Sequence, residues 1–241
     1  MIKDKLYFLL SPDFIERESI RKSLLEILRD YGSQFSRKNL LDIGCGSQPY
    51  KKYFINKKIK YFGIDFYDYS KNHAFPISKP DYFFKKQYPK DFFLSQFKDN
   101  TFDIISAFQV LEHHEKPSKF FSEARRILKN RGYMILSFPF IWQLHEEPRD
   151  YQRFTHFKIE KFALEYGFEI IKIKKRGSTF STVSQILSLS FQEIKIPRLI
   201  KTFISIILFT PLEYISIVYD HLINNEDKKI FLGYSILLRK I

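Results

Sequence analysis

The sequence is nearly free of cysteine, and it lacks internal repeats and low-complexity linkers. Cys45 is the only cysteine among 241 residues, which excludes an intrachain disulfide and favours a reducing compartment. The apolar run that ends at Leu10 is too short to span a bilayer, and no small-residue cleavage site follows it. We therefore expect a cytoplasmic protein and leave open peripheral contact with the inner membrane face.

Acidic residues are outnumbered in this chain. Lys and Arg number 40 against 27 Asp and Glu, and the net charge of +13 favours an anionic partner: a membrane surface, a phosphorylated substrate or nucleic acid. Hydrophobic residues make up 44%, enough for a sizeable core. The length fits one α/β domain, which we divide into an N-terminal helical segment (1–37), a core (38–177), an apolar helical insertion (178–229) and a last strand (230–241).

Predicted strands and helices alternate through the middle of the chain. Strands are expected at 39–43, 59–65, 102–108, 133–138, 169–175 and 231–240. Helices are expected from Ser11 to Gly32, from the glycine turn to about Lys57, through Phe120, Phe121, Ala124, Ile127 and Leu128 to a cap at Gly132, and from Lys158 to Gly167. This alternation predicts a mostly parallel sheet covered on both faces.

A glycine loop follows the first predicted strand. Ligands bind beyond the carboxyl ends of strands in open parallel sheets, and the segment Asp42–Gly46 stands at such an end. Gly44 and Gly46 allow a tight turn and a close approach to a ligand. Asp65 ends the second predicted strand, where a carboxylate can accept hydrogen bonds from ribose hydroxyls.

Two features separate the candidate ligands of this loop. A dinucleotide site with G-x-G-x-x-G spacing requires glycine at position 49, where this chain has Pro49. Asp42 lies two residues before the first glycine, and a carboxylate there suits a ligand ammonium group and repels a pyrophosphate. The alternative is a strand-to-helix turn without a ligand.

Further motifs make the chain resemble class I S-adenosylmethionine-dependent methyltransferases over residues 38–175 and the last strand. The motifs are Leu40–Gly46, Asp65, Asp99–Ile105, Val110–His113 and Arg125–Lys129 followed by Gly132. The resemblance implies a Rossmann-like three-layer sandwich whose seven-stranded, mostly parallel sheet has an antiparallel last strand. It also implies S-adenosyl-L-methionine as the cofactor and methyl transfer as the activity.

The resemblance carries over to individual positions. Methionine contacts are implied at Asp42, Gly44, Gly46 and Gln109, a ribose contact at Asp65 and an adenine contact at Asp91 and Phe92, with Cys45, Phe66 and His113 as further cofactor-binding residues. Two positions depart from the family pattern, because Gln48 and Arg131 replace glycines. For Glu112 and His113 the alternative is a structural role as caps or braces. Phe108 and Phe138 are expected in the core.

The segment 145–155 is rich in charged and aromatic residues and follows the fifth strand of the fold. It is similar to an H-x-x-P-x-D-Y-x-R-Y/F-T stretch in a subset of bacterial methyltransferases, many of them encoded with surface-polysaccharide or lipid-modifying enzymes. His145 is the expected general base, since histidine titrates near neutrality. The other expected acceptor-side residues are Asp150 and Tyr151 as catalytic rivals and Arg153 and His114 as substrate-binding groups. The alternative for Asp150 and Arg153 is an internal ion pair.

Two further expectations concern metal and membrane. We expect no metal site, because none of the six histidines forms an H-E-x-x-H pair. The apolar stretch 199–219 contains Pro211 and Glu213, which argue against a bilayer-spanning helix. It is expected to form either a buried helix or dimer contact, or an interfacial helix pair whose membrane contact extends over 195–219.

Three functions compete at this point. The preferred one is methyl transfer to a small-molecule, glycan or lipid-linked acceptor. Methylation of RNA or another nucleic acid is less favoured, because Ser106–Gln109 lacks the N-P-P-Y signature of base-amino methylation and no RNA-binding module is evident. A non-catalytic cofactor-binding subunit is the third.

Overall fold

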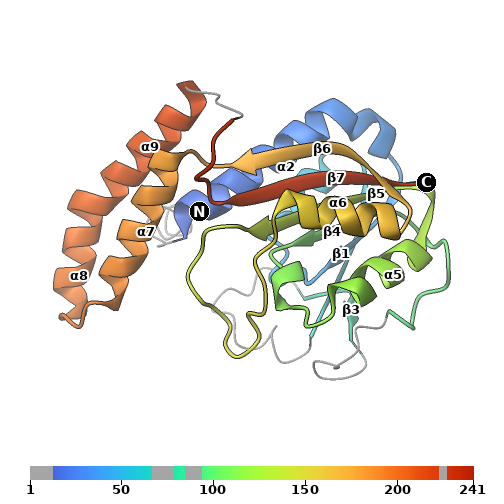
Figure 1. The fold of residues 1–241 in the computed structure, drawn as a ribbon, viewed down its shortest axis with the longest axis horizontal. Helices are drawn as coiled ribbons and strands as arrows, with labels where there is room; N and C mark the ends of the chain where they lie inside the picture. Colours follow the sequence, from blue (N-terminus) through green and yellow to red (C-terminus); the bar gives the residue numbers. More distant parts are fainter. Residues whose placement is uncertain (1–12, 67–78, 85–93, 223–226) are drawn as a thin grey trace. The chain divides into compact units, whose positions relative to one another are not determined.

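A computed structural model describes residues 13–66, 79–84, 94–222 and 227–241 of the chain. Its strands are β1 (Asn39–Ile43), β2 (Lys60–Asp65), β3 (Tyr82–Phe83), β4 (Phe102–Phe108), β5 (Leu128–Pro139), β6 (Phe168–Arg176) and β7 (Gly233–Lys240). They form one sheet in the order β3-β2-β1-β4-β5-β7-β6 (Figure 1). The pairs from β3 to β5 are parallel, and β7 runs antiparallel between β5 and β6. This confirms the predicted Rossmann-like α/β fold.

Helical segments precede, connect and follow these strands along the chain. They are α2 (Phe14–Phe35), α3 (Lys51–Ile55), the 3-10 turn η1 (Leu111–His113), α5 (Pro117–Ile127), α6 (His156–Glu165), α7 (Thr179–Glu193), α8 (Arg198–Ile204), the π-helical turn η2 (Ser205–Phe209) and α9 (Thr210–Leu222).

The chain separates into two compact units. The first holds the described parts of Met1–Ser23, Phe140–Gln143 and Lys175–Gly233, and the second holds those of Leu24–Pro139, Leu144–Lys174 and Tyr234–Ile241. Nearly all of the sheet belongs to the second unit, and α7 to α9 belong to the first. The expected single domain with an insertion stays a prediction.

The core of the second unit forms where the sequence is apolar on both sides of its strands. Central parallel strands are buried on both faces, which explains why most residues of β1 and β4 are apolar, although Asp42 and Ser106 are buried among them. The apolar face predicted around Phe120 and Phe121 is buried on α5, and the Phe121 ring stacks on Phe162 of α6 with centroids 5.0 Å apart. Phe108 and Phe138 are buried, as predicted.

Two glycines predicted to end helices do not do so. Gly32 lies inside α2, which continues to Phe35, a fully buried ring. Gly132 lies within β5, where an added Cβ would stand 2.9 Å from the Asp103 carbonyl oxygen. Leu128 Cγ and the Lys129 carbonyl oxygen of β5 itself would be nearer still, at 2.7 Å and 2.8 Å, so a side chain has no room beside this shift in strand register. By contrast, Gly167 follows α6 with φ of 62°, as a helix-ending glycine should.

Pro211, which at the level of sequence argues against a bilayer-spanning helix, does not interrupt the helix that contains it. Residues Arg198–Leu222 form one continuous helix through α8, η2 and α9. A proline lacks the amide proton that an α-helix requires, and the π-helical turn just before it changes the local hydrogen bonding. Within that turn the Thr210 hydroxyl donates to the Ser205 carbonyl at 3.1 Å.

Candidate active site

The glycine loop lies at the carboxyl end of β1, within the second unit. Gly44 and Gly46 have φ of 65° and 50°, in the left-handed region that favours glycine. The Gly44 amide donates to the Ile64 carbonyl at 2.9 Å. An added Cβ on Gly44 would lie 2.5 Å from Val110 Cγ2. Glycine is therefore required at position 44 by both backbone conformation and space.

Asp65 closes this loop from the end of β2. Its Oδ2 accepts from the Gly46 amide at 2.5 Å and its Oδ1 from the Phe66 amide at 2.7 Å. The side chain of Phe66 stacks on Phe84, with ring centroids 4.5 Å apart. Each carboxylate oxygen has a second lone pair. The predicted ribose contact of Asp65 is therefore compatible with its observed bonds to the loop, and it stays a prediction.

Asp42 is bound inside the sheet. Its Oδ2 accepts from the Tyr61 hydroxyl at 2.5 Å and its Oδ1 from the Ser106 hydroxyl at 2.7 Å. Burial raises the pKa of Asp42, the two hydrogen bonds lower it, and nearby Asp65 raises it again, to about 7. Asp42 thus connects β1 to both neighbouring strands, and its methionine contact stays a prediction.

Sequence reasoning missed Tyr61 and Ser106 as partners of Asp42. A signal was present, because Ser106 is the one polar residue among Ile104, Ile105 and Ala107. It lies directly across from Asp42 in the register of β1 and β4. Pairing Ser106 with Asp42 requires the register of β1 against β4, which cannot be derived from the two segments separately.

Both departures from the family's glycine pattern keep the backbone of glycine. Gln48 has φ of 59° and Arg131 has φ of 60°. Gln48 is held there by its side chain, whose Nε2 donates to the Lys79 carbonyl at 2.8 Å and whose Oε1 accepts from Lys51 at 2.7 Å. Both positions therefore have a left-handed backbone although neither is glycine, Gln48 in a turn and Arg131 within β5.

Of the remaining predicted cofactor residues, Gln109 and Cys45 lie within the described part of the chain. Gln109, with φ of 55°, follows β4 and is fastened to Ser137 of β5 by its amide and by its side chain, each at 2.8 Å. Cys45 is buried, and burial raises the pKa of its thiol. Asp91 and Phe92 lie outside the described residues.

The segment after β5 organises a histidine and a carboxylate. His145 Nδ1 lies 3.1 Å from Asp150 Oδ2, and the His145 amide donates to the same oxygen at 3.1 Å. Two guanidinium nitrogens of Arg153 donate to the two carboxylate oxygens of Asp150, at 2.5 Å and 2.7 Å. The internal ion pair, which is the alternative for these two residues, is thus present, and a substrate contact by Arg153 stays a prediction.

Burial and charge set the protonation state of Asp150. Its side chain is 1% exposed. Burial raises the pKa of Asp150, but hydrogen bonds from Arg153 and from the His145 amide, with the positive charge of both partners, lower it to about 2. Asp150 therefore remains a carboxylate beside His145 at neutral pH.

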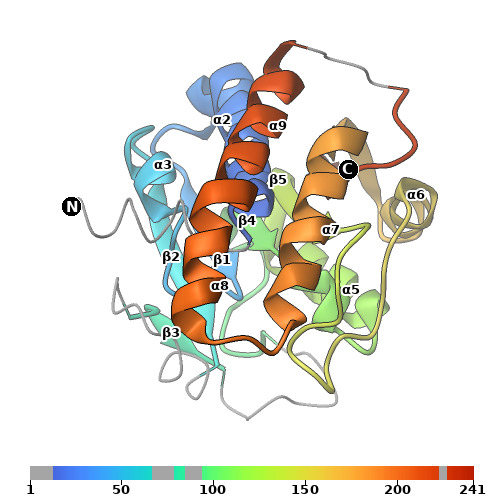
Figure 2. The same ribbon diagram turned by 90° about the vertical axis from the view of Figure 1, so that its left-hand side faces the viewer.

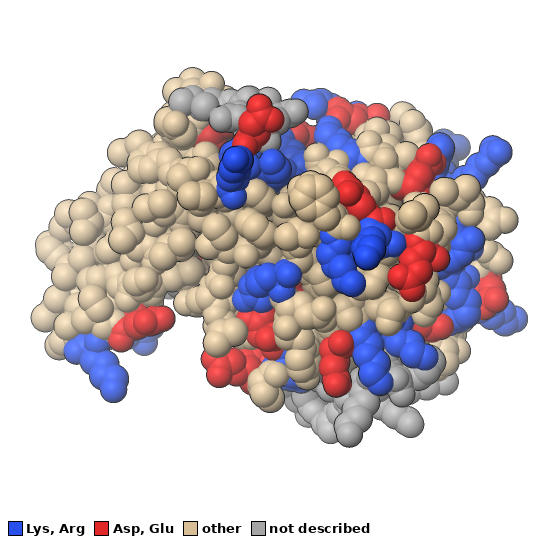
Figure 3. Space-filling view, in the orientation of Figure 1, with Lys and Arg blue, Asp and Glu red and all other residues tan. Residues whose placement is uncertain are grey.

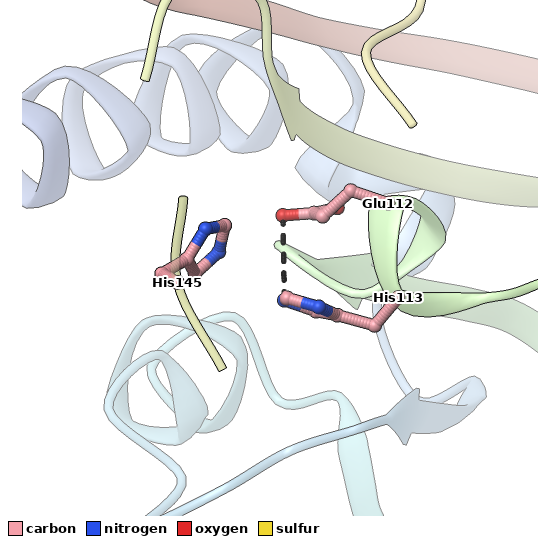
Figure 4. Close-up of side chains that lie close together, drawn as sticks. All are labelled: Glu112, His113 and His145. Atoms are coloured by element: carbon pink, nitrogen blue, oxygen red, sulfur yellow. Dashed lines mark ion pairs between the residues drawn. The ribbon is translucent and has the colours of Figure 1, made fainter. Parts of the chain in front are cut away.

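A second histidine approaches from η1. The His113 and His145 rings meet edge to face, with centroids 4.7 Å apart, and Figure 4 shows both beside Glu112. His113 Nδ1 lies 2.8 Å from the Arg149 carbonyl, and its Nε2 is 3.9 Å from Glu146. Burial lowers the pKa of His113, while Glu146 raises it.

Glu112, His113 and His145 can each offer one ligand atom within 4.8 Å of the others, an arrangement that can hold a metal ion. Glu112 is fully buried, and its carbonyl accepts from the Tyr151 amide at 3.0 Å. Because the three residues come from two separate segments, a search for helical spacing could not find the cluster. The expected absence of a metal stays a prediction.

His114 and Tyr151 are placed differently from the other expected acceptor-side residues. Burial lowers the pKa of His114 to about 4, with the charge of His113 as the smaller cause. Its ring lies against Phe120. The side chain of Tyr151 is on the surface, since the residue is 47% exposed. Their predicted roles in binding and catalysis stay predictions.

The 3-10 turn η1 links the two halves of the site. Val110, just before it, occupies the space that a side chain at Gly44 would need. His113, at its end, contacts His145. The glycine loop and the segment 144–155 therefore meet through one short turn after β4, at the edge of the sheet where ligands bind.

The described residues fit S-adenosylmethionine. Gly44 and Gly46 have a left-handed backbone and no Cβ, which allows a ligand to approach the backbone of the loop closely. The carboxylate of Asp65 lies beside this loop with acceptor capacity for ribose hydroxyls. Position 49 is proline, so the pyrophosphate-binding glycine spacing is absent.

Comparison with solved structures supports the same fold. A SAM-dependent methyltransferase from Archaeoglobus fulgidus superimposes with a TM-score of 0.55 at 18% identity, covering 91% of this chain and 94% of that one. Phosphoethanolamine N-methyltransferase 2 from Haemonchus contortus, in complex with phosphomonomethylethanolamine and S-adenosylhomocysteine, gives 0.51 at 17%, with 91% of this chain and 52% of that chain covered. The cyclase SpnF gives 0.52 at 18%, covering 88% and 80%. At these identities the likeness shows the fold alone.

Comparison with family models identifies the family of this chain. No curated protein matches the sequence. The family model described as "Methyltransferase domain" matches residues 15–173, which include the glycine loop, Asp65, η1 and segment 144–155. The chain belongs to this methyltransferase family, and its cofactor is S-adenosylmethionine.

Proposed function

We propose that this chain methylates a hydroxyl of a glycan or lipid-linked acceptor, with His145 as the general base. The observation that carries the proposal is the 3.1 Å contact of His145 Nδ1 with Asp150, whose carboxylate Arg153 holds with two nitrogens. A hydroxyl must lose its proton during methyl transfer, and a positioned histidine can accept it. A neutral amine attacks with its own lone pair and needs no such base.

Asp150 determines which histidine nitrogen is basic. A proton on Nδ1 donated to Asp150 leaves the lone pair of the neutral ring on Nε2. Because Asp150 is buried and ionised, it stabilises the imidazolium that forms once Nε2 accepts the acceptor's proton. Arg153 holds Asp150 in that orientation.

The glycine loop would hold the cofactor through Gly44, Gly46, Asp65 and Gln109. When bound, S-adenosylmethionine supplies an electrophilic methyl group on a sulfonium. The protein's contribution is to align the acceptor oxygen with that methyl group and to keep water away, which can lower the barrier by roughly 7–11 kcal/mol at best.

The acceptor class is supported by charge and by sequence likeness. The net charge of +13 favours an anionic acceptor such as a phosphorylated or lipid-linked glycan. The segment that carries His145, Asp150 and Arg153 is similar to one in methyltransferases encoded with surface-polysaccharide and lipid-modifying enzymes.

The test is methyl transfer from labelled S-adenosylmethionine to a panel of glycan and lipid-linked acceptors. We expect His145→Gln and Asp150→Asn to lower kcat by about 10²–10⁴-fold and to leave the calorimetric cofactor affinity unchanged. His156→Gln, on α6, is the matched control and should retain activity. Transfer to RNA or to amines alone, or full activity of His145→Gln, would overturn the proposal.

A further inference from the structure

Apart from Leu189, the buried residues on the helix pair of the first unit are polar. Its members are α7 and the continuous helix Arg198–Leu222, which lie side by side in Figures 1 and 2. Ring contacts join Phe180 to Tyr219 and Phe191 to Phe209, so the two helices run antiparallel. In a water-soluble pair, apolar side chains would face inward.

Polar side chains are buried on both helices of this pair, and Gln185 contacts α2, where its side chain accepts from the Glu16 amide at 3.3 Å. On α7 they are Ser181, Thr182, Ser184, Gln185 and Ser188, and on α9 they are Glu213 and Ser216. Serine hydroxyls are satisfied by the helices themselves, as Ser184 donates to the Phe180 carbonyl at 2.9 Å and Ser216 to the Glu213 carbonyl at 2.7 Å. Small hydroxyl residues between helices are characteristic of helix packing in membranes.

Large apolar side chains are exposed on the same two helices. They are Val183, Ile186 and Leu187 on α7, and Leu199, Ile200, Phe203, Ile206, Ile207, Leu208, Tyr214, Ile215, Val218, Tyr219 and Leu222 on the long helix. Leu199 is 85% exposed and Phe203 is 65% exposed. The sequence favours burial or a dimer contact for this stretch, yet only 17% of its most apolar window is buried. Water is a poor solvent for such a surface.

Positive charge gathers at the start of the long helix. Lys195 and Arg198 are exposed just before and at its first turn, and Lys201 follows one turn later with its ammonium on the Gln192 carbonyl. Figure 3 shows that uncharged side chains cover most of the visible surface over α7 to α9. Cations beside an apolar helical face are complementary to anionic lipid headgroups and acyl chains.

We propose that the first unit binds an anionic lipid bilayer through the exposed face of α7 and Arg198–Leu222. The 25 residues of the long helix are enough to cross a bilayer by length and composition. α7 packs against another side of it, where the buried Glu213 side chain forms a hydrogen bond with Ser188 of α7. The helix therefore lies in the headgroup region with its apolar face toward the acyl chains. This proposal does not depend on the identity of the methyl acceptor.

The experiment is flotation of the full chain with phosphatidylcholine vesicles, with and without phosphatidylglycerol. We expect binding that is at least tenfold stronger to the anionic vesicles. Phe203→Ser with Ile207→Ser should weaken binding at least tenfold, while the matched pair Phe157→Ser with Leu164→Ser, also exposed but on α6, should not. Lys195→Glu with Arg198→Glu should remove the preference for phosphatidylglycerol, and Lys161→Glu on α6 should retain it.

Two readouts make the result decisive. Cofactor affinity and thermal unfolding check that each variant is folded. Amide hydrogen exchange should slow within α7 and Arg198–Leu222 when anionic vesicles are added, and should not slow within α6. The proposal is overturned if the wild-type chain does not float with either vesicle. It is also overturned if sedimentation shows a stable dimer that protects these helices and excludes vesicles.

Discussion

The glycine loop and the segment 144–155 form the two halves of the candidate active site by different means. The loop depends on backbone conformation, with positive φ at Gly44, Gly46 and Gln48 and buried carboxylates fastening it. The segment depends on side chains that meet across separate parts of the chain, such as His113 and His145. Backbone requirements restrict which residues are allowed at fixed positions, so they leave a readable motif. Contacts between side chains from distant segments restrict the residue type at each position less, so they leave no short motif.

Among the predicted changes, Gly44→Ala should reduce stability and cofactor binding most. The new Cβ lies 2.5 Å from Val110 Cγ2 and the residue keeps φ of 65°, so we expect unfolding to become easier by about 2–5 kcal/mol, together with loss of cofactor binding. Urea denaturation and calorimetry measure both. Adding Val110→Ala should restore part of the stability. Gly32→Ala, at a helical glycine, should instead stabilise by about 0.5–1 kcal/mol; equal effects at both glycines would contradict the special status of the loop.

Asp42 should make stability depend on pH. Its pKa is raised to about 7, so between its ordinary value and about 7 the folded protein holds a proton that the unfolded chain has released. Stability therefore falls as pH rises through this window. From about pH 5 to about pH 8 we expect a wild-type loss of about 2–3 kcal/mol that Asp42→Asn lacks. Urea unfolding of Asp103→Asn, a half-buried carboxylate, provides the control and should follow the wild-type curve.

Arg153→Lys tests the half that is built from side chains. A lysine cannot hold both oxygens of Asp150, so His145 should be less well oriented. We expect kcat to fall about tenfold, or about 1.4 kcal/mol, with KM and cofactor affinity little changed. A matched Arg29→Lys change on the surface of α2 should have no effect. A rise in KM alone would indicate instead that Arg153 contacts the acceptor.

Arg131→Gly should change the free energy of unfolding least. It tests whether glycine is favoured at this position because of the backbone conformation. Relief of φ of 60° outweighs the added freedom of the unfolded chain, so we expect stabilisation by up to about 1 kcal/mol. Asn130→Gly, next to it but without positive φ, should destabilise by about 0.5–1 kcal/mol. Thermal unfolding of the two variants side by side reveals the difference, and the same sign for both would refute the interpretation.

Much of the fold follows from local sequence. Mostly apolar segments identified β1, β4 and much of β5, and the spacing of Phe120, Phe121, Ala124 and Ile127 identified α5. The errors concern glycine and proline. Gly132 lies inside β5, where Leu128, Lys129 and Asp103 leave no room for a Cβ, and Pro211 lies after a π-helical turn. Neither feature follows from the local helix-end signals of glycine and proline.

The active site was predictable to a similar degree. Gly44, Gly46 and Asp65 were identified from position, and the structure places all three in one hydrogen-bonded loop. The partners of Asp42 and the cluster of Glu112, His113 and His145 were not, because each joins residues distant in sequence.

The sequence was enough to predict the cofactor and the sheet that carries it, because the glycine loop, Asp65 and the motifs after them occupy fixed positions along the chain. Tertiary structure alone decided which side chains meet at His145 and which face of Arg198–Leu222 is exposed. Both depend on contacts between segments far apart in the chain, and composition is the same whichever way such a helix is turned.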